Sequence, residues 1–211
     1  MAGDEAGRAL DGVPGSATEQ RWRVLRRIAG RHAGFFTTRQ AWRTGCAARV
    51  RSAIGEGAVT EGESGLLRLA EWPSGPLDEY AMWAAWFDGA VAVSHHSAAE
   101  LHGLGRLRPT FLHVAVRGPG ASARTASVPP RLVVRKGFSL GEVESAGPFL
   151  VTTPVRTVLD LAAADIGQLA LNEVVADAVA IHRCAGEEIR CAGERSAPPV
   201  AERLRRALAA A

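Results

Sequence analysis

Arginine is concentrated in one stretch of the chain. Its guanidinium group is the most abundant side-chain group in this sequence that could bind a charged ligand. The 211 residues hold 25 Lys and Arg against 22 Asp and Glu, a formal net charge of +3. The stretch from Glu19 to Ala70 holds ten arginines and four glutamates, so it carries +6 and the remainder −3. Its arginines are Arg21, Arg23, Arg26, Arg27, Arg31, Arg39, Arg43, Arg49, Arg51 and Arg68. Clustered guanidinium groups can neutralise phosphates and release counterions, which predicts a nucleic-acid contact here.

The hydrophobic pattern of this stretch predicts three short helices followed by a β-hairpin. The expected elements are a helix capped by Thr18 and ended by Gly34, helices over Thr38–Thr44 and Ala47–Glu56, and hairpin strands over Val59–Glu61 and Leu66–Leu69. Gly45 separates the second and third helices, where a tight turn with positive φ favours glycine. Phe35 and Phe36 are expected to form an extended connection, and Ala41 and Trp42 to face the core. This order of elements is typical of a winged helix-turn-helix.

Seven side chains of this predicted module are candidates for contact with DNA. They are Thr38, Arg39, Arg43, Arg49, Arg51, Ser52 and Arg68. Arg39, Arg43 and Arg68, with the helix-terminal amides, are expected to hold phosphates. Arg49 and Arg51 are expected to reach base edges from the third helix, where a bidentate contact with guanine discriminates by ~1–3 kcal/mol. The alternative is that these arginines solvate two helix faces or contact another protein.

The predicted fold class is α+β, with four segments along the chain. Residues 1–17 are expected to be a disordered leader, and residues 18–73 the winged helix-turn-helix. Prolines make the segment from Trp72 to Pro76 a stiff linker. Residues 77–185 are expected to be a small α/β domain with a mixed sheet, and residues 186–211 a tail with a terminal helix.

The α/β domain is predicted to alternate short strands with helices. The expected strands are Val91–Val93, Phe111–Val116, Arg131–Val134, Glu142–Ser145 and Phe149–Val151. The expected helices are Leu77–Phe87, Ser97–Leu104 capped by Ser94, a helix capped by Thr153 with Pro154 at its first position, Ile166–His182 and Val200–Ala209. A proline is well tolerated at the first position of a helix, because its missing N–H has no partner there.

Three histidines and one charged pair are the other polar features of this domain. His95, His96 and His102 could serve a metal or a general base, but their spacing does not place two imidazoles one helical turn apart. Capping or core hydrogen bonding is therefore the preferred interpretation. Arg156 and Asp160 are four residues apart and are expected to form an ion pair on a helix face.

No enzymatic activity is expected from this sequence, and no metal ion or cofactor. Cys46, Cys184 and Cys191 lack the clustering of a zinc site and are interpreted as reduced side chains of a cytoplasmic protein. The sole lysine, Lys136, lacks the preceding acidic residue of a metal-dependent nuclease motif, and the chain contains no Asp-x-Asp, P-loop or Gly-x-Ser-x-Gly sequence. There is neither a long apolar run nor a secretory signal pattern, so no membrane association is expected.

Four segments carry distinctive motifs: Phe36–Ala41 with Gly45, Val93–Leu104, Leu112–Val116 and Val151–Ala162. Together they resemble the AbiEi-type antitoxin family of bacterial type IV toxin–antitoxin operons. Phe36–Ala41 with Gly45 is similar to the helix-turn-helix of that family, and Val93–Leu104 to its serine–histidine–serine–alanine–alanine helix start. Leu112–Val116 is similar to its first central strand, and Val151–Ala162 to its threonine–proline–arginine–threonine–aspartate–leucine–alanine segment. The resemblance covers roughly residues 20 to 180.

The resemblance implies a transcriptional repressor that binds inverted repeats in its own promoter, followed by an α/β domain that contributes to antitoxicity. It also implies a functional pairing with a nucleotidyltransferase toxin that does not form a stable complex with the antitoxin. A homodimer on double-stranded DNA is expected, since one short recognition helix reads few base pairs.

Two other hypotheses stay open. The hairpin carries Glu61 and Glu63, so the module could instead dock on a protein partner through an acidic wing. A degenerate enzyme that uses the region of His95 and His96 is the third hypothesis.

Overall fold

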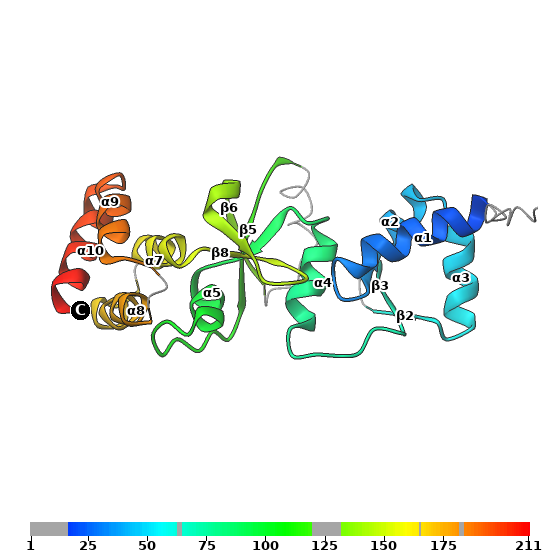
Figure 1. Cartoon of the computed structure of the whole chain (residues 1–211), viewed down its shortest axis with the longest axis horizontal. Coiled ribbons are helices and arrows are strands. Elements are labelled where there is room, and N and C mark those ends of the chain that lie inside the picture. Colours follow the sequence, from blue (N-terminus) through cyan, green and yellow to red (C-terminus); the bar gives the residue numbers. More distant parts are fainter. Residues whose placement is uncertain (1–16, 63–64, 120–131, 165, 182–183) are drawn as a thin grey trace, which may run out of the picture.

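The computed structural model has an α+β fold, which confirms the predicted fold class. It describes residues 17–62, 65–119, 132–164, 166–181 and 184–211, so the leader predicted over residues 1–17 lies outside the described residues except for Ala17. Figure 1 shows an elongated molecule with three successive parts. A small N-terminal unit lies at one end, a five-stranded sheet with α4 occupies the middle, and a group of helices forms the other end.

The N-terminal unit contains three helices and a three-stranded antiparallel sheet. Its elements are α1 (Ala17–Gly30), β1 (Phe35–Thr37), α2 (Thr38–Arg43), α3 (Ala47–Gly55), β2 (Val59–Glu61) and β3 (Leu66–Leu69), and the strand order is β1-β3-β2. The predicted hairpin strands therefore have the predicted bounds. Several details differ from prediction. Helix α1 ends at Gly30 and not at Gly34. Thr18 lies inside α1 instead of capping it, and the expected extended connection is a third strand in which Phe35 pairs with Arg68.

The prediction that Trp42 faces the core is wrong, because its side chain is 77% exposed. The inward positions of α2 are taken by Gln40 and Ala41, which are 4% and 2% exposed. Gln40 is polar but buried, since its side-chain amide bonds the start of its own helix. Successive residues of an α-helix are rotated by about 100°. Trp42, the residue after Ala41, therefore points away from the core and into solvent.

The middle part is a five-stranded mixed sheet covered by α4 (Asp78–Trp86). Its strands are β4 (Val91–Val93), β5 (Leu112–Val116), β6 (Leu132–Lys136), β7 (Val143–Ser145) and β8 (Leu150–Thr152), in the order β6-β5-β4-β8-β7. The pairs β4–β8 and β5–β6 are parallel, whereas β4–β5 and β7–β8 are antiparallel. Trp83 of α4 and Phe87, directly after it, pack with Val93 and Val114 in one core cluster.

The second face of this sheet carries smaller side chains. Ala92 and Ala115 alternate with the valines of their strands and pack with Phe138. Successive residues of a strand point to opposite faces, so the valines contact α4 while the alanines contact the segment that follows β6.

A helical layer forms the remaining end of the molecule. It contains α5 (His95–His102), α7 (Pro154–Ala163), α8 (Gln168–Ala180), α9 (Gly186–Glu194) and α10 (Pro198–Ala210). Helix α9 was not predicted, and the segment interpreted as a tail packs into a core: Ile189, Leu204 and Ala207 are 0–1% exposed and join a cluster with Leu171. The sequence of α9 has a single large apolar residue, Ile189, between its terminal positions, so few apolar side chains mark it as a core helix.

Three contacts fix the N-terminal unit against the middle part. Arg68 of β3 forms an ion pair with Asp78 of α4 at 2.9 Å. The ring of His32 donates through Nδ1 to the carbonyl oxygen of Pro148 at 3.0 Å. The third contact runs from α2 to Asp88, directly after α4. Together they set the orientation of α2 and α3 relative to the sheet.

Gly34 offers a test of how the N-terminal unit is packed. It has φ +85, and a Cβ there would lie 2.7 Å from Cβ of Trp72. Gly34→Ala is expected to lower the free energy of unfolding by at least ~2 kcal/mol, from left-handed strain and overpacking together. Gly55→Ala is the control, because nothing lies within 4 Å of its added Cβ and its φ is not positive. Urea unfolding of both variants measures this, and equal effects would contradict the packing described.

Candidate nucleic-acid interface

A hydrogen-bonded cap fixes where α2 begins. The amide N–H of Thr37 donates to Oε1 of Gln40 at 2.8 Å, and the N–H of Gln40 donates back to Oγ1 of Thr37 at 3.2 Å. This reciprocal capping box satisfies two N–H groups that a helix start leaves without partners.

The turn from α2 into α3 is equally well defined. Gly45 has φ +70, and the N–H of Cys46 donates to the carbonyl of Ala41 at 2.8 Å. A Cβ on Gly45 would lie 3.3 Å from Cδ of Arg21, so the side chain of this α1 arginine lies against the turn. Both the backbone conformation and this neighbour favour glycine at position 45.

The outer face of α2 carries the predicted residues Thr38, Arg39 and Arg43, all exposed. Arg43 forms an ion pair with Asp88 at 2.7 Å and its side chain remains 65% exposed. Gln40 donates to the other carboxylate oxygen of Asp88 at 2.8 Å. Arg39 borders a hollow of about 170 Å³ that Asp88 also lines. Helix α2 therefore presents two guanidinium groups close to one carboxylate of the middle part.

Helix α3 exposes the predicted base-reading residues in different ways. Arg49 lies over the ring of Trp22, 5.4 Å from its centroid, and forms an ion pair with Glu56 at 2.9 Å. Arg51 and Ser52 are exposed on the same helix. Ion pairs this exposed are worth ~0–1 kcal/mol, so they can open when a phosphate or a base edge approaches.

Arg68 is predicted to hold a phosphate, but in the structure its guanidinium group is engaged by other groups of the protein. Its guanidinium lies 4.6 Å from the ring centroid of Phe35 and bonds Asp78, Ser74 and the carbonyl of Pro73, and its side chain is 14% exposed. These contacts join β3 to the segment before α4. A phosphate could reach this guanidinium only by breaking them, so Arg68 is a junction residue in the structure.

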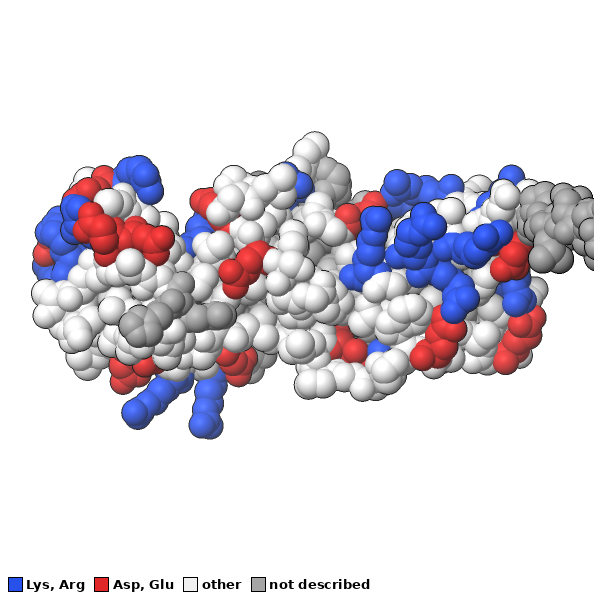
Figure 2. All heavy atoms as spheres, viewed as in Figure 1, with Lys and Arg blue, Asp and Glu red and all other residues white. Residues whose placement is uncertain are grey.

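The sequence interpretation omitted the arginines of α1 from the site, although it counted their charge. Arg21, Arg23, Arg26, Arg27 and Arg31 are all exposed. Figure 2 shows basic side chains gathered over the N-terminal unit, whereas basic and acidic side chains mix at the opposite end. At that end Arg190 pairs with Glu187 and Glu194, and Arg205 and Arg206 pair with Glu202.

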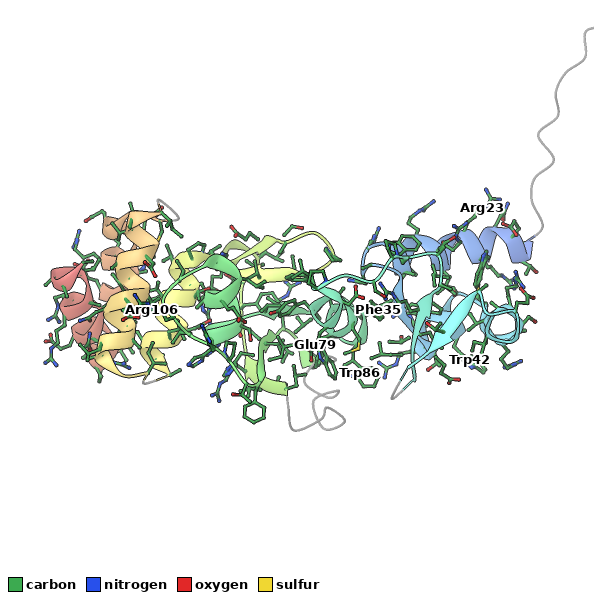
Figure 3. The ribbon with its side chains drawn as sticks, turned by 90° about the horizontal axis from the view of Figure 1, so that it is seen from below. Arg23, Phe35, Trp42, Glu79, Trp86 and Arg106 are labelled. Carbon is green, nitrogen blue, oxygen red and sulfur yellow. The ribbon has the colours of Figure 1, made fainter. Side chains whose placement is uncertain are left out.

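The exposed basic side chains of the N-terminal unit come from α1, α2 and α3. In Figure 3, Arg23 of α1 and Trp42 of α2 lie at opposite edges of this unit. Arg21 is the α1 arginine shown to reach the α2–α3 turn. The candidate interface is therefore defined as α2, the Gly45 turn, α3 and Arg21.

The histidines of α5 make core contacts. Nε2 of His102 bonds the carbonyl oxygen of Thr152 at 2.7 Å, and the residue is 6% exposed. Nδ1 of His95 lies 3.0 Å from Oγ of Ser94 and 3.8 Å from Oδ2 of Asp160. In a catalytic triad the two ring nitrogens of the histidine contact different partners. Here Nδ1 of His95 faces both Ser94 and Asp160, so the three residues do not have the geometry of a triad.

His95 also has an unusual backbone and an altered proton affinity. Its φ of +50 is uncommon for a residue other than glycine. Burial, then the nearby His113 and Arg135, lowers the pKa of His95 to about 4. Burial, then His96 and Arg135, likewise lowers the pKa of His113 to about 4.

The predicted ion pair of α7 is confirmed, with Nε of Arg156 2.7 Å from Oδ1 of Asp160. Arg156 also pairs with Glu142 at 2.6 Å, which ties α7 to the turn before β7. Among the described residues, no group of three or more His, Cys, Asp or Glu is arranged to hold a metal ion. The thiols of Cys46, Cys184 and Cys191 are free. No described helix has the length and apolar character needed to cross a membrane.

Comparison with solved structures finds a similar fold. A protein from Mycobacterium tuberculosis, RV2827C, has a solved structure that matches with a TM-score of 0.53 and 16% sequence identity, over 91% of this chain and 77% of that one. No family model matches the chain. No curated protein matches it either. The similarity supports the α+β fold, and at this level of identity it says nothing about activity.

The lowered pKa values of His95 and His113 make stability depend on pH. An unfolded histidine titrates near 6.5, so below that pH the unfolded chain binds protons that the folded chain does not. The free energy of unfolding is expected to fall as pH drops from 6.5 towards 4, and imidazole NMR signals should show both rings neutral at pH 5. His95→Asn should weaken the pH dependence, because asparagine tolerates positive φ but does not titrate. Rings that titrate near 6.5 would contradict this.

Proposed function

We propose that the N-terminal unit, from α1 to β3, is a winged helix-turn-helix that binds double-stranded DNA. The observation that carries the proposal is the pair α2 and α3, joined at Gly45, with exposed Arg39, Arg43 and Arg51 in a stretch of net charge +6. Helices joined in this way place the second helix in the major groove while the first crosses the backbone. In this arrangement α3 is the recognition helix.

The exposed arginines divide the work of binding. Arg39 and Arg43 on α2 hold phosphates, and Arg21 beside the turn is placed to add a third such contact. Arg49 and Arg51 on α3 face the bases, with Ser52 beside them. Arg68 is left out of this set, because it holds β3 to Asp78.

We further propose that the protein represses its own operon as an antitoxin of a type IV toxin–antitoxin-like system in the cytoplasm. This part is supported by the resemblance of four segments to AbiEi-type antitoxins. It predicts inverted repeats in the promoter, binding by a homodimer, and a neighbouring gene for a nucleotidyltransferase toxin that is opposed without a stable complex. Binding to the DNA upstream of its own gene, measured by mobility shift, tests it.

Salt and two substitutions separate phosphate contacts from base contacts. The logarithm of the affinity for a promoter duplex should fall linearly with the logarithm of salt concentration, by about 0.9 per phosphate neutralised. Arg43→Ala should weaken binding to every duplex alike and lower that slope by about one. Arg51→Ala should instead reduce the preference for the promoter sequence, by ~1–3 kcal/mol. Fluorescence anisotropy measures all three, and salt-independent binding or equal effects of the two substitutions would contradict the proposal.

The carboxylate of Asp88 should compete with DNA for Arg43. Asp88→Asn removes that charge and suits the positive φ of 58 at this position. It is expected to raise the affinity for any duplex several-fold, because Arg43 then faces a neutral amide instead of a carboxylate. Glu56→Gln is the matched variant on α3, where it frees Arg49. Unchanged affinity in both variants would show that these arginines do not meet DNA.

A second candidate function is a protein-interaction module. It is favoured by the hairpin, where Glu61 is exposed on β2 and Arg68 is engaged by Asp78, so the wing offers little positive charge. In that case the protein would show no mobility shift on its promoter at low salt.

A further inference from the structure

Trp42 is the most exposed aromatic residue in the part of the chain that the structure describes, at 77%. It lies in the last turn of α2, two residues before the C-cap of that helix, Thr44. Its neighbours Gln40 and Ala41 fill the inward positions, so no rotation of α2 can bury the indole without exposing them. The inward packing of Gln40 and Ala41 therefore keeps the indole of Trp42 exposed to solvent.

Arginines lie on the same face of α2 as the indole. Arg39 and Trp42 are three residues apart and Arg43 is four from Arg39, so the three share one face of α2. Arg21 lies against Gly45, just beyond the end of the helix. A partner that covers Trp42 must therefore accommodate several guanidinium groups next to an apolar ring.

We propose that Trp42 packs against the deoxyribose of a DNA strand whose phosphates are bound by Arg39 and Arg43. The inference rests on the proposed function and adds an apolar contact to the same site. DNA fits this surface because its backbone alternates an anionic phosphate with a sugar that has an apolar edge. The first helix of a helix-turn-helix crosses the backbone instead of entering the groove, so Trp42 meets sugar and not base edges. The contact is independent of sequence.

The test combines affinity with salt dependence. Trp42→Ala should weaken binding to promoter and unrelated duplexes alike, by about fivefold, the lower end of the effect of removing an aromatic ring that stacks on a base. The salt slope should stay that of the natural protein, because an apolar contact releases no counterions, whereas Arg43→Ala lowers it. Trp42→Phe should keep part of the affinity. Leu169→Ala is the control, since Leu169 is 81% exposed on α8, at the other end of the molecule.

Other outcomes separate this inference from the proposed function. If the natural protein binds duplex DNA and Trp42→Ala binds equally well, the inference is overturned and the proposed function stands. If the natural protein binds no duplex at low salt, both fail. If Trp42→Ala changes only the molecular mass in solution, the ring is covered by a second copy of the chain and the DNA contact is overturned. Unfolding curves that match the natural protein show that the variants are folded.

Discussion

The buried amide of Gln40 is the contact on which the arrangement of the candidate interface depends. Its Oε1 accepts from the N–H and the hydroxyl of Thr37, at 2.8 and 3.2 Å, and its Nε2 donates to Asp88 at 2.8 Å. One side chain thus caps α2 and attaches it to the end of α4. A buried amide without these partners would destabilise the fold by ~1–3 kcal/mol, so the inward position of Gln40 is strongly determined.

The outward face of α2 follows from that constraint. With Gln40 and Ala41 inside, the guanidinium groups of Arg39 and Arg43 and the indole of Trp42 must face outward. Asp88 contributes a second effect, because it accepts from both Gln40 and Arg43. The same carboxylate that positions the helix also neutralises one of its cations, which couples the orientation of the N-terminal unit to the strength of its surface charge.

Much of the fold could be predicted from the sequence, because many elements show a clear hydrophobic period or a turn residue. The strands β2 and β3 have their predicted bounds, and the start of α7 follows from Thr153 and Pro154. Helix α9 could not be predicted, since its burial depends on contacts with α7 and α10 that no local pattern reveals.

The candidate site was predicted less completely, for a physical reason. Charge and helical position identify arginines that are candidates for contact with DNA. Whether such a guanidinium group is free to bind DNA depends on residues that are distant in the sequence. Arg68 is engaged by Asp78 and Arg43 by Asp88. The apolar indole of Trp42 predicts an inward position, but in the structure Gln40, which caps the helix, takes an inward position instead. These pairings become visible only in three dimensions.

Amide hydrogen–deuterium exchange, with and without a promoter duplex, tests the central claim most directly, because it locates the DNA on the chain. Slower exchange is expected over α2 and α3, with α8, α9 and α10 unchanged. Protection confined to those C-terminal helices, or no protection anywhere at a duplex concentration that shifts the protein in a gel, would contradict the account.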